Sequence, residues 1–471
     1  MERKQATGKL RIRAGERQFI LLLGDLIVSS LSVVIALYFW AQNDWLNFSW
    51  SFFNQRAPFW FYLLPIIWSI MLIELYDTRK ANRHSDVLRG VGAAFGFSVL
   101  IYLLIFFLAQ SNSLPRRGVA VFLVSVTLLT IIWRFIYIAI FTAPVFNRRV
   151  LVIGAGRAGS TLVSMVKRIK PEPFELVGYI DDDALKQGKS IEDLPVIGTT
   201  ETLLACIDKE KITDIVFAIS GEMKPDLFRS VLLAQEEGTD LISMPTIYED
   251  VFGRVPIFLL QSDWILRSFI DQAQTSGIYE AIKRVLDILS GLIGLVFLVV
   301  LYPIIALTIL IDDGFPIFYS QMRVGKNGRP YKIYKFRTMR KDAESDGVAR
   351  MTTTGDNRIT RLGKILRRSH IDELPQVINI LKGENSLIGP RAEQIELVNQ
   401  FQEQIPFYRA RLFVKPGITG WAQVNQRYAS TVEDTAVKLE YDLYYIKHRN
   451  LLLDMNIAIR TIGAVLGFRG L

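Results

Sequence analysis

The sequence is poor in the residues that build disulfides and zinc sites. Its 471 residues include a single cysteine, Cys206, so an intramolecular disulfide is excluded. The three histidines, at positions 84, 370 and 448, are scattered, and a zinc site built on histidine is not expected. The sequence also lacks a nucleic-acid-binding motif, so we expect no nucleic acid partner. A chain without disulfides suits a reducing compartment such as the cytoplasm.

Apolar residues, by contrast, are abundant: half of all residues are hydrophobic, and the net charge is +9. A basic N-terminal segment precedes an apolar run from Phe19 to Ala41, interrupted by Asp25, which is too long for the apolar core of a signal peptide. Three more runs are long enough to cross a bilayer, at Phe59–Tyr76, Val91–Ala109 and Val119–Phe141. Residues 1–147 are therefore predicted to form a four-helix transmembrane domain.

The charges in the loops predict the orientation of these helices. The N-terminal segment, the loop 77–89 and Arg148-Arg149 are basic, whereas the loops 42–58 and 110–118 hold only three arginines. By the positive-inside bias, both ends of the four-helix domain face the cytoplasm. We find no charge pair in the predicted spans that indicates a transport path, and we expect the helices to serve as an anchor.

A second type of segment begins at Val150–Ile153, which reads as a buried parallel strand. It is followed by Gly154, Gly156 and Gly159, spaced so that a backbone can approach a pyrophosphate at a helix N-terminus. Further strands are predicted at Leu176–Ile180, Ile215–Ala218 and Leu241–Met244. Residues 148–250 are thus predicted to form a Rossmann-like α/β domain with a parallel sheet.

The three glycines are candidate nucleotide-binding residues, and Asp181, Asp182 or Asp183 is the candidate acid for a ribose. A glycine motif of this kind is common, and no Tyr-x-x-x-Lys pair follows it. Two roles stay open for the domain: binding of a regulatory nucleotide, or a structural module that forms a homodimer.

Residues 251–279 are predicted to link this domain to an apolar segment, 280–311, which contains Pro303. Hydropathy alone favours a fifth span. The alternative is a re-entrant hairpin, because Pro303 removes a backbone hydrogen bond and bends a helix so that both ends return to one membrane face. The basic flanks Lys283-Arg284 and Arg323–Arg329 favour the hairpin.

Residues 312–471 carry several short predicted elements. Two strands, Ile317–Gln321 and Tyr331–Phe336, flank a turn, and the polar segment 340–358 is expected to form a mobile loop. A basic amphipathic helix bearing Arg361, Lys364, Arg367 and Arg368 lies either in a head-group layer or in solvent. Leu451–Phe468 is a second amphipathic stretch, which rests on the membrane or caps the domain.

Two adjacent acids, Asp372 and Glu373, are the candidate catalytic residues. Pro375 is tolerated only in the first turn of a helix, so the pair is placed at a helix start that Gly383 later ends. The helix dipole, together with Arg367 and Arg368, is expected to hold both carboxyl groups ionised near neutral pH. Ionised acids suit a nucleophile and a metal ligand.

The segment around this pair resembles the signature of the bacterial polyprenyl-phosphate hexose-1-phosphate transferases, in their long, multi-spanning form. The matching motifs, in order, are Arg323-Val324-Gly325, Tyr334-Lys335-Phe336-Arg337-Thr338-Met339, Asp356-Asn357-Arg358-Ile359-Thr360, Asp372-Glu373-Leu374-Pro375-Gln376, Leu387-Ile388-Gly389-Pro390-Arg391 and Lys415-Pro416-Gly417-Ile418-Thr419-Gly420. One departure is Ser369-His370-Ile371, where the family more often has Thr-Ser-Leu.

The resemblance implies transfer of a hexose 1-phosphate from a UDP-sugar to undecaprenyl phosphate, with release of UMP, at the cytoplasmic face of the bacterial inner membrane. It further implies that Asp372 forms an aspartyl-phosphosugar intermediate. Glu373 is suited to hold Mg²⁺, which takes one or two carboxylates and phosphate oxygens. Four cationic side chains are candidates for binding phosphates: Lys335, Arg337, Arg367 and Arg391.

The expected fold is therefore an α/β membrane protein with four N-terminal transmembrane helices, a Rossmann-like middle domain, a re-entrant membrane hairpin and a small α/β catalytic domain over 312–471. Two other functions are considered. One is an NAD-dependent membrane nucleotide-sugar dehydratase, which the missing Tyr-x-x-x-Lys pair disfavours, and the other is a non-enzymatic scaffold for polysaccharide export.

Overall fold

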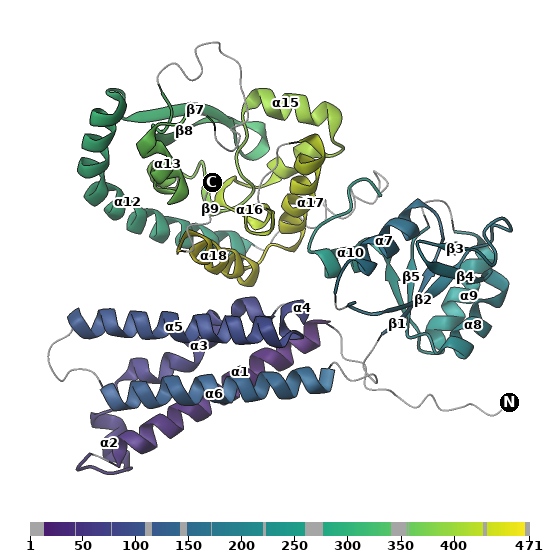
Figure 1. Cartoon of the computed structure of the whole chain (residues 1–471), viewed down its shortest axis with the longest axis horizontal. Helices are drawn as coiled ribbons and strands as arrows, with labels where there is room; N and C mark the ends of the chain where they lie inside the picture. Colours follow the sequence, from purple (N-terminus) through teal and green to yellow (C-terminus); the bar gives the residue numbers. More distant parts are fainter. Residues whose placement is uncertain are drawn as a thin grey trace. The chain divides into compact units, whose positions relative to one another are not determined.

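The chain forms two compact units that divide near Arg149. In this computed structural model the described residues are 14–42, 44–76, 78–108, 115–141, 148–170, 172–219, 223–259, 277–340, 356, 358–426 and 431–466. The first unit holds the N-terminal helices, and the second holds a sheet domain and a C-terminal domain (Figure 1). Most of the predicted loop 340–358 lies outside the described residues.

Long apolar helices dominate the first unit. Three of its helices are long and apolar enough to span a bilayer: α1 (Ala14–Ala41), α5 (His84–Leu108) and α6 (Arg116–Phe141). Two short helices, α2 (Trp50–Gln55) and α4 (Thr78–Ala81), lie between them in the sequence. The first, third and fourth predicted spans are thus confirmed as single helices.

The second predicted span, Phe59–Tyr76, is wrong as a single helix. It is divided into η1 (Phe59–Leu63), α3 (Leu64–Met71) and η2 (Ile73–Tyr76), of which η1 and η2 are 3₁₀ helices. Proline explains the first break, because Pro65 stands in the first turn of α3, where its missing N–H needs no partner. The fourth long apolar helix of the described chain lies instead in the second unit.

A charge pair lies inside the helical bundle, contrary to our reading of the sequence. The Arg134 guanidinium of α6 donates to both carboxylate oxygens of Asp25 in α1, and its Nη1 donates to the Leu75 carbonyl at 2.7 Å. Both charged side chains are fully buried. A buried carboxylate is stable only beside a cation, so the pair fixes how α1 packs against α6.

The sheet domain is built on six strands in the order β3-β4-β2-β1-β5-β6. The strands are β1 (Arg149–Ile153), β2 (Glu175–Ile180), β3 (Ser190–Ile191), β4 (Leu194–Gly198), β5 (Asp214–Phe217) and β6 (Asp240–Ser243). The helical elements are α7 (Arg157–Lys167), η4 (Thr200–Thr202), α8 (Leu203–Glu210), α9 (Pro225–Glu236) and α10 (Met244–Phe252). The pairs β1–β5, β5–β6 and β2–β4 are parallel. All four predicted strands are present, and the short antiparallel hairpin of β3 and β4 was not predicted.

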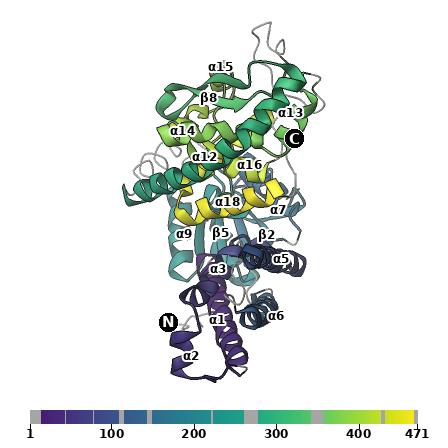
Figure 2. The ribbon, with the colours of Figure 1, turned by 90° about the vertical axis from the view of Figure 1, so that its left-hand side faces the viewer.

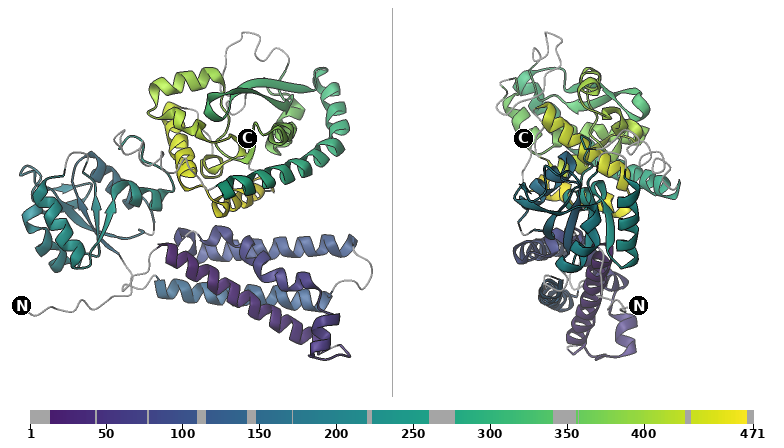
Figure 3. Two further views of the ribbon diagram at one scale, coloured as in Figure 1. Left: turned by 180° about the vertical axis from the view of Figure 1, so that it is seen from behind. Right: turned by 90° about the vertical axis from the view of Figure 1, so that its right-hand side faces the viewer.

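Helices cover both faces of this sheet, with α8 and α9 on one side and α7 and α10 on the other (Figures 1 and 3). The arrangement follows from the sequence, because strands buried on both faces are continuous apolar runs such as Val150–Ile153, which is almost fully buried.

The C-terminal domain is mostly helical. Its helices are α12 (Gly277–Asp313), α13 (Arg361–Arg368), α14 (Val377–Lys382), α15 (Ile395–Gln404), α16 (Trp421–Asn425), α17 (Val432–His448) and α18 (Leu451–Leu466). Short 3₁₀ turns are η5 (Lys326–Gly328), η6 (Ile371–Gln376) and η7 (Tyr408–Phe413). The strands β7 (Phe318–Val324) and β8 (Pro330–Phe336) form an antiparallel hairpin, and β9 (Ser386–Ile388) pairs in parallel with β10 (Gly417–Thr419).

Helix α12 is 37 residues long and keeps Pro303 in its interior. Its ribbon bends part-way along its length (Figures 1 and 3). Both ends contact the same domain: near its start, Arg284 donates to the Ile380 and Leu381 carbonyls, and near its end, Asp312 accepts from the Leu362 amide. Large apolar side chains on α12 stay exposed, Val296, Val299, Val300 and Ile304 among them.

The segment predicted as a linker contributes to the core of the C-terminal domain. Val255 and Ile257 are 0% and 1% exposed and pack in the same cluster as Phe401 and Leu439. Before them, Glu249 of α10 accepts from Lys447, and the Trp421 indole donates to the Gly253 carbonyl at 2.7 Å. The sheet domain and the C-terminal domain are therefore joined by buried contacts.

Candidate functional site

The acid pair lies on η6, the 3₁₀ turn that leads into α14. His370 precedes this turn in a left-handed conformation, with φ 57°, and Gly383 ends α14 in the same region, with φ 83°. Pro375 is inside the turn, where a missing N–H is tolerated. The predicted place of the pair at a helix start thus holds, although the first turn is 3₁₀ and not α-helical.

Glu373 is held from two directions. Lys335, on β8, donates to its Oε1 at 2.6 Å, and Arg391, which follows β9, donates to both carboxylate oxygens. The Glu373 residue is only 7% exposed. Burial raises the pKa of this carboxyl, but Arg391 and Lys335 outweigh it and hold the pKa well below its ordinary range.

Asp372 is buried in a different way. The residue is 6% exposed, and within the described chain no hydrogen bond to its carboxylate is found. Burial and the negative charge of Glu373 raise the pKa of Asp372 to about 6, against the opposing effect of Lys335, Arg367 and Arg391. With a pKa of about 6, Asp372 is still largely ionised near neutral pH, as expected, but burial raises its pKa above the ordinary value, an effect that the sequence does not show.

Arg367 is brought to the site by close packing of α13 on the strand end. A Cβ on Gly363 would lie 2.1 Å from the Thr338 carbonyl oxygen, so only glycine allows this approach. Arg367 Nε then donates to Thr338 Oγ1 at 2.9 Å, and its charge lowers the pKa of Asp372. Arg367 thus faces the acid pair without forming an ion pair with it.

The structure does not bring Arg337 to the acid pair. Its guanidinium donates to the carbonyls of Asp313 and Gly314, and it forms an ion pair with Asp313 at 3.1 Å. The residue is buried, and it fastens the end of α12 to the strand that carries Lys335. Three of the four predicted cations therefore surround the acids.

Arg411, which lies behind the site, was not identified from the sequence. Arg411 donates to the backbone carbonyl of Arg391 at 3.0 Å and pairs with Asp442 at 2.7 Å. It positions the segment that carries Arg391, from a place 20 residues later in the chain. No local motif marks Arg411, since its partners come from distant elements.

A magnesium ion would need to displace existing contacts at the acid pair. Both oxygens of Glu373 already accept hydrogen bonds from cations. Among the described residues, no group of three or more histidine, cysteine or acidic side chains is arranged for a metal. Mg²⁺ requires only one or two carboxylates when phosphate oxygens complete its shell, so Glu373 fits such an ion once Lys335 or Arg391 moves to a phosphate.

The glycine motif of the sheet domain has two structural glycines and one open position. A Cβ on Gly159 would lie 2.1 Å from the Gly154 carbonyl oxygen, and Gly154 has φ 100°, whereas a Cβ on Gly156 would meet nothing within 4 Å. Asp181, the first of the three acids considered for a ribose, accepts instead from the Ala155 amide at 2.8 Å. Gly154 and Gly159 are thus explained by packing, and nucleotide binding stays a prediction.

Two family models match the chain. Residues 278–468 match the family described as "Bacterial sugar transferase", and residues 71–245 match the one described as "CoA-binding domain". The first match covers the whole acid-pair centre, including Lys335 and Arg391.

Several curated proteins are similar in sequence. Over 320 residues the chain is 38% identical to the UDP-glucose:undecaprenyl-phosphate glucose-1-phosphate transferase of Escherichia coli (strain K12), across 67% of this chain and 68% of that protein. It is 28% identical to the undecaprenyl-phosphate glucose phosphotransferase of Komagataeibacter xylinus, across 94% of this chain and 83% of that protein.

A shorter alignment gives a higher identity. The chain is 44% identical over 220 residues to the UDP-N-acetylgalactosamine-undecaprenyl-phosphate N-acetylgalactosaminephosphotransferase of Aeromonas hydrophila, across 47% of this chain. That alignment spans only 51% of the Aeromonas protein. The first two relatives are named for glucose and this one for N-acetylgalactosamine.

Proposed function

The chain belongs to the bacterial sugar transferase family, and from this premise we propose that it transfers a hexose 1-phosphate from a UDP-sugar to undecaprenyl phosphate. The proposed products are a polyprenyl-diphosphate sugar and UMP, in the first step of exopolysaccharide, capsule or O-antigen synthesis. The observation that carries the proposal is the acid pair itself. Among the described residues no hydrogen bond to the buried Asp372 carboxylate is found, and the neighbouring Glu373 is fixed by Lys335 and Arg391.

Asp372 acts as the nucleophile in this proposal. One of its oxygens attacks the phosphorus that bears the sugar, the bond from that phosphorus to the UMP oxygen breaks, and an aspartyl-phosphosugar forms. An oxygen of the lipid phosphate then attacks the same phosphorus and releases the carboxylate. A carboxylate that is desolvated and makes no hydrogen bond is a better nucleophile than a solvated one, and a pKa of about 6 leaves it ionised at pH 7.

The cations around the pair receive the phosphates. In this proposal Lys335, Arg391 and Arg367 bind the diphosphate of the donor, and the guanidinium of Arg391 can bind two oxygens at once. Mg²⁺, held by Glu373 and phosphate oxygens, would neutralise the charge that builds on the departing UMP. Arg337 serves the site indirectly, because it holds the strand of Lys335 against α12.

We further propose that α12 enters the inner membrane as a re-entrant hairpin and returns the C-terminal domain to the cytoplasmic face. A straight helix of its length would measure about 55 Å at 1.5 Å per residue, more than a bilayer core. Both ends of α12 contact one domain, and apolar side chains around Pro303 are exposed. These observations favour a helix that bends back within the membrane and not one that crosses it. The N-terminal helices anchor the chain in the same membrane.

The direct test is UMP release from a panel of UDP-sugars by the purified chain in detergent, with undecaprenyl phosphate and Mg²⁺. We expect lipid-dependent release from one donor, which also identifies the sugar. Release that is absent for every donor, or that does not depend on the lipid, contradicts the proposal. Labelled donor without lipid should leave sugar phosphate bound to the wild-type protein and not to Asp372→Asn.

A further inference from the structure

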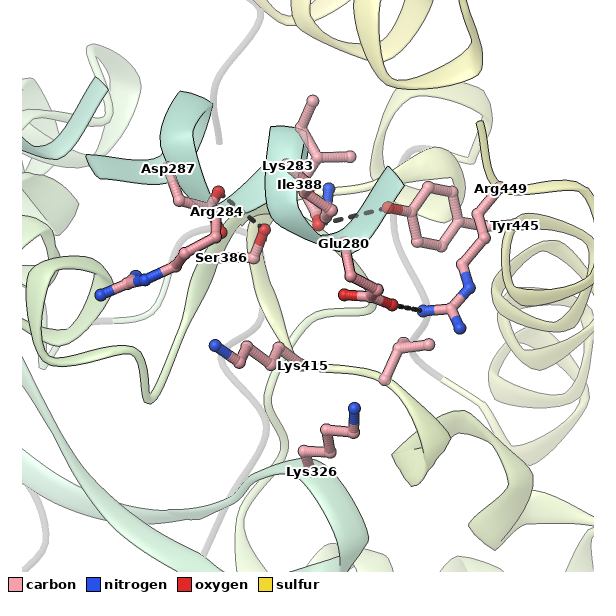
Figure 4. A pocket seen from close by; sticks show the side chains of 11 residues that line it. Glu280, Lys283, Arg284, Asp287, Lys326, Ser386, Ile388, Lys415, Tyr445 and Arg449 are labelled. Carbon is pink, nitrogen blue, oxygen red and sulfur yellow. Dashed lines mark hydrogen bonds and ion pairs between the residues drawn. The ribbon is translucent and has the colours of Figure 1, made fainter. Parts of the chain in front are cut away.

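A second cationic centre lies in the C-terminal domain, at the start of α12. An open pocket is formed there between the first turns of α12, the turn η5 and the segment before β10 (Figure 4). Among the described residues, neither acid of the pair lines it, nor do Lys335 and Arg391. The pocket is therefore separate from the centre proposed for chemistry.

The acids of this pocket already have partners. Glu280 accepts from Arg449 at 2.8 Å, and Asp287 accepts from the Ser386 hydroxyl and the Leu387 amide, both at 2.9 Å. Lys283, a further lining cation, binds Asp454 at 2.9 Å. The negative charges of the pocket are thus committed to fixed contacts.

Two lysines of the pocket have no such contact. In the part of the chain that the structure describes, no hydrogen bond or ion pair is found for the amino groups of Lys326 and Lys415. Figure 4 shows them on two separate segments, across the pocket from the helix that bears Glu280 and Arg284. Arg284 donates to the Ile380 and Leu381 carbonyls, and its five N–H groups leave others available.

These cations are close enough to repel one another. A Cβ on Gly383 would lie 3.5 Å from Arg284 Nη2 and 3.6 Å from Lys415 Nζ, so the two groups approach one point. Burial, Arg284 and Lys326 lower the pKa of Lys415, with Asp287 opposing. An anion in the pocket would relieve this repulsion.

Exposed apolar side chains lie beside the polar residues of the pocket. The lining positions Glu280, Lys283, Arg284 and Asp287 share one face of α12, at helical spacing. Exposed apolar residues occupy the other faces, namely Ile278, Ile282, Val285, Leu286 and Leu289. Helix α18 lies beside α12 (Figure 2), where Lys283 of α12 donates to Asp454. Its side chains Leu452 and Ile462 are exposed as well.

We propose that this pocket is a second phosphate-binding site, with Lys326, Lys415 and Arg284 as its donors, and that it takes the phosphate of a lipid headgroup. Unmatched cations beside exposed apolar helix faces fit the boundary between head groups and hydrocarbon, where the phosphate of an anionic lipid lies. The site would fix the depth and tilt of the C-terminal domain at the membrane surface. A soluble phosphate shares the same chemistry, and the experiment separates the two sources.

The test measures thermal unfolding of the full chain in a nonionic, phosphate-free detergent. Three probes are titrated: short-chain phosphatidic acid, short-chain phosphatidylcholine and inorganic phosphate. We expect phosphatidic acid to raise the unfolding temperature at the lowest concentration. The double variant Lys326→Gln/Lys415→Gln should need about tenfold more of it, because two charge-assisted contacts are lost. It keeps Lys335 and Arg391, so the difference isolates the pocket.

The matched control removes two exposed lysines elsewhere, Lys332→Gln/Lys209→Gln, and should respond like the wild type. The single variant Lys326→Gln, at an exposed position, keeps the test valid if the double variant folds poorly. An equal response of double variant and control to phosphatidic acid and to inorganic phosphate overturns the site. Inorganic phosphate acting as strongly as phosphatidic acid, with the response lost in the double variant, supports the site and overturns the lipid source.

Discussion

Two centres of the C-terminal domain gather cations, and they differ in what those cations face. Around the acid pair, Lys335 and Arg391 are bound to Glu373, so positive and negative charge are matched within the protein. At the start of α12, Glu280 and Asp287 are bonded to other groups, and within the described chain no ion pair to the amino group of Lys326 or Lys415 is found. Matched charge keeps a site rigid before substrate arrives, whereas unmatched charge favours binding of an anion.

The difference extends to the two acids. Glu373 is ionised over the whole ordinary pH range because Arg391 and Lys335 offset the effect of its burial on the pKa. For Asp372, burial and the charge of Glu373 both raise the pKa and oppose ionisation. Adjacent carboxyl groups with pKa values pushed apart are suited to different tasks. Removing one partner of an ion pair such as Glu373–Arg391 should therefore lower stability or rate, whereas removing Lys326, for which no ion pair is found among the described residues, should mainly weaken anion binding.

The largest expected effect is that of Asp372→Asn on turnover. If Asp372 is the covalent nucleophile, its loss should lower the rate of UMP release by about 10³-fold or more. Thermal stability should hold or rise, since the variant removes a buried carboxylate for which no hydrogen bond is found in the described part of the chain. Retention of more than about a tenth of the wild-type rate would rule out the nucleophile.

The second largest effect is expected for Arg134→Gln, in the fully buried ion pair Asp25–Arg134. The variant leaves the Asp25 carboxylate without its cation inside the helical bundle, at an expected cost of about 3–5 kcal/mol. Thermal unfolding in detergent measures it, and Asp25→Asn/Arg134→Gln, which removes both charges, should recover much of the loss. No recovery in the double variant would show that shape, and not charge matching, sets the effect.

Glu373→Gln should have a smaller effect on stability and a clear one on rate. It deprives Lys335 and Arg391 of their carboxylate, and because the Arg391 side chain is 38% exposed we expect about 2 kcal/mol, below the cost for a fully buried pair. The rate of UMP release should fall and depend less on Mg²⁺. An unchanged Mg²⁺ dependence would remove Glu373 as the metal ligand.

The mildest change is one of pH. Because Asp372 must be ionised to attack and its pKa is about 6, UMP release should fall about tenfold between pH 7 and pH 5. The folded pKa lies above its ordinary value, so protonation of Asp372 favours the fold, and this contribution is lost as pH rises through about 6. A rate that is flat across this range would mean that Asp372 titrates much lower.

Local patterns in the sequence predicted what depends on neighbours in the chain. Pro375 and Gly383 bounded the turn of the acid pair, and apolar runs predicted three of the N-terminal helices and four of the six strands of the sheet. Arg391 and Lys335 were identified as phosphate binders, and the structure brings both to Glu373.

Contacts between distant residues were beyond this reasoning. Asp25 and Arg134 are 109 residues apart, and each looks like an isolated charge in an apolar run. The same holds for Arg337, whose partner Asp313 ends a different helix, and for Arg411 behind Arg391. Burial decided the pKa of Asp372, and burial follows from packing that no short motif contains.

The placement of Val255 and Ile257 in the core of the C-terminal domain has a practical consequence for shortening the chain. The family match begins at residue 278, but the Val255 amide also donates to the Glu440 carbonyl at 3.0 Å. A fragment that starts at the family boundary would lose both side chains and leave an apolar hole beside Leu439. A fragment that begins at Gly253 would keep Val255 and Ile257 in the core. The shortest active fragment should therefore begin at Gly253 or before it.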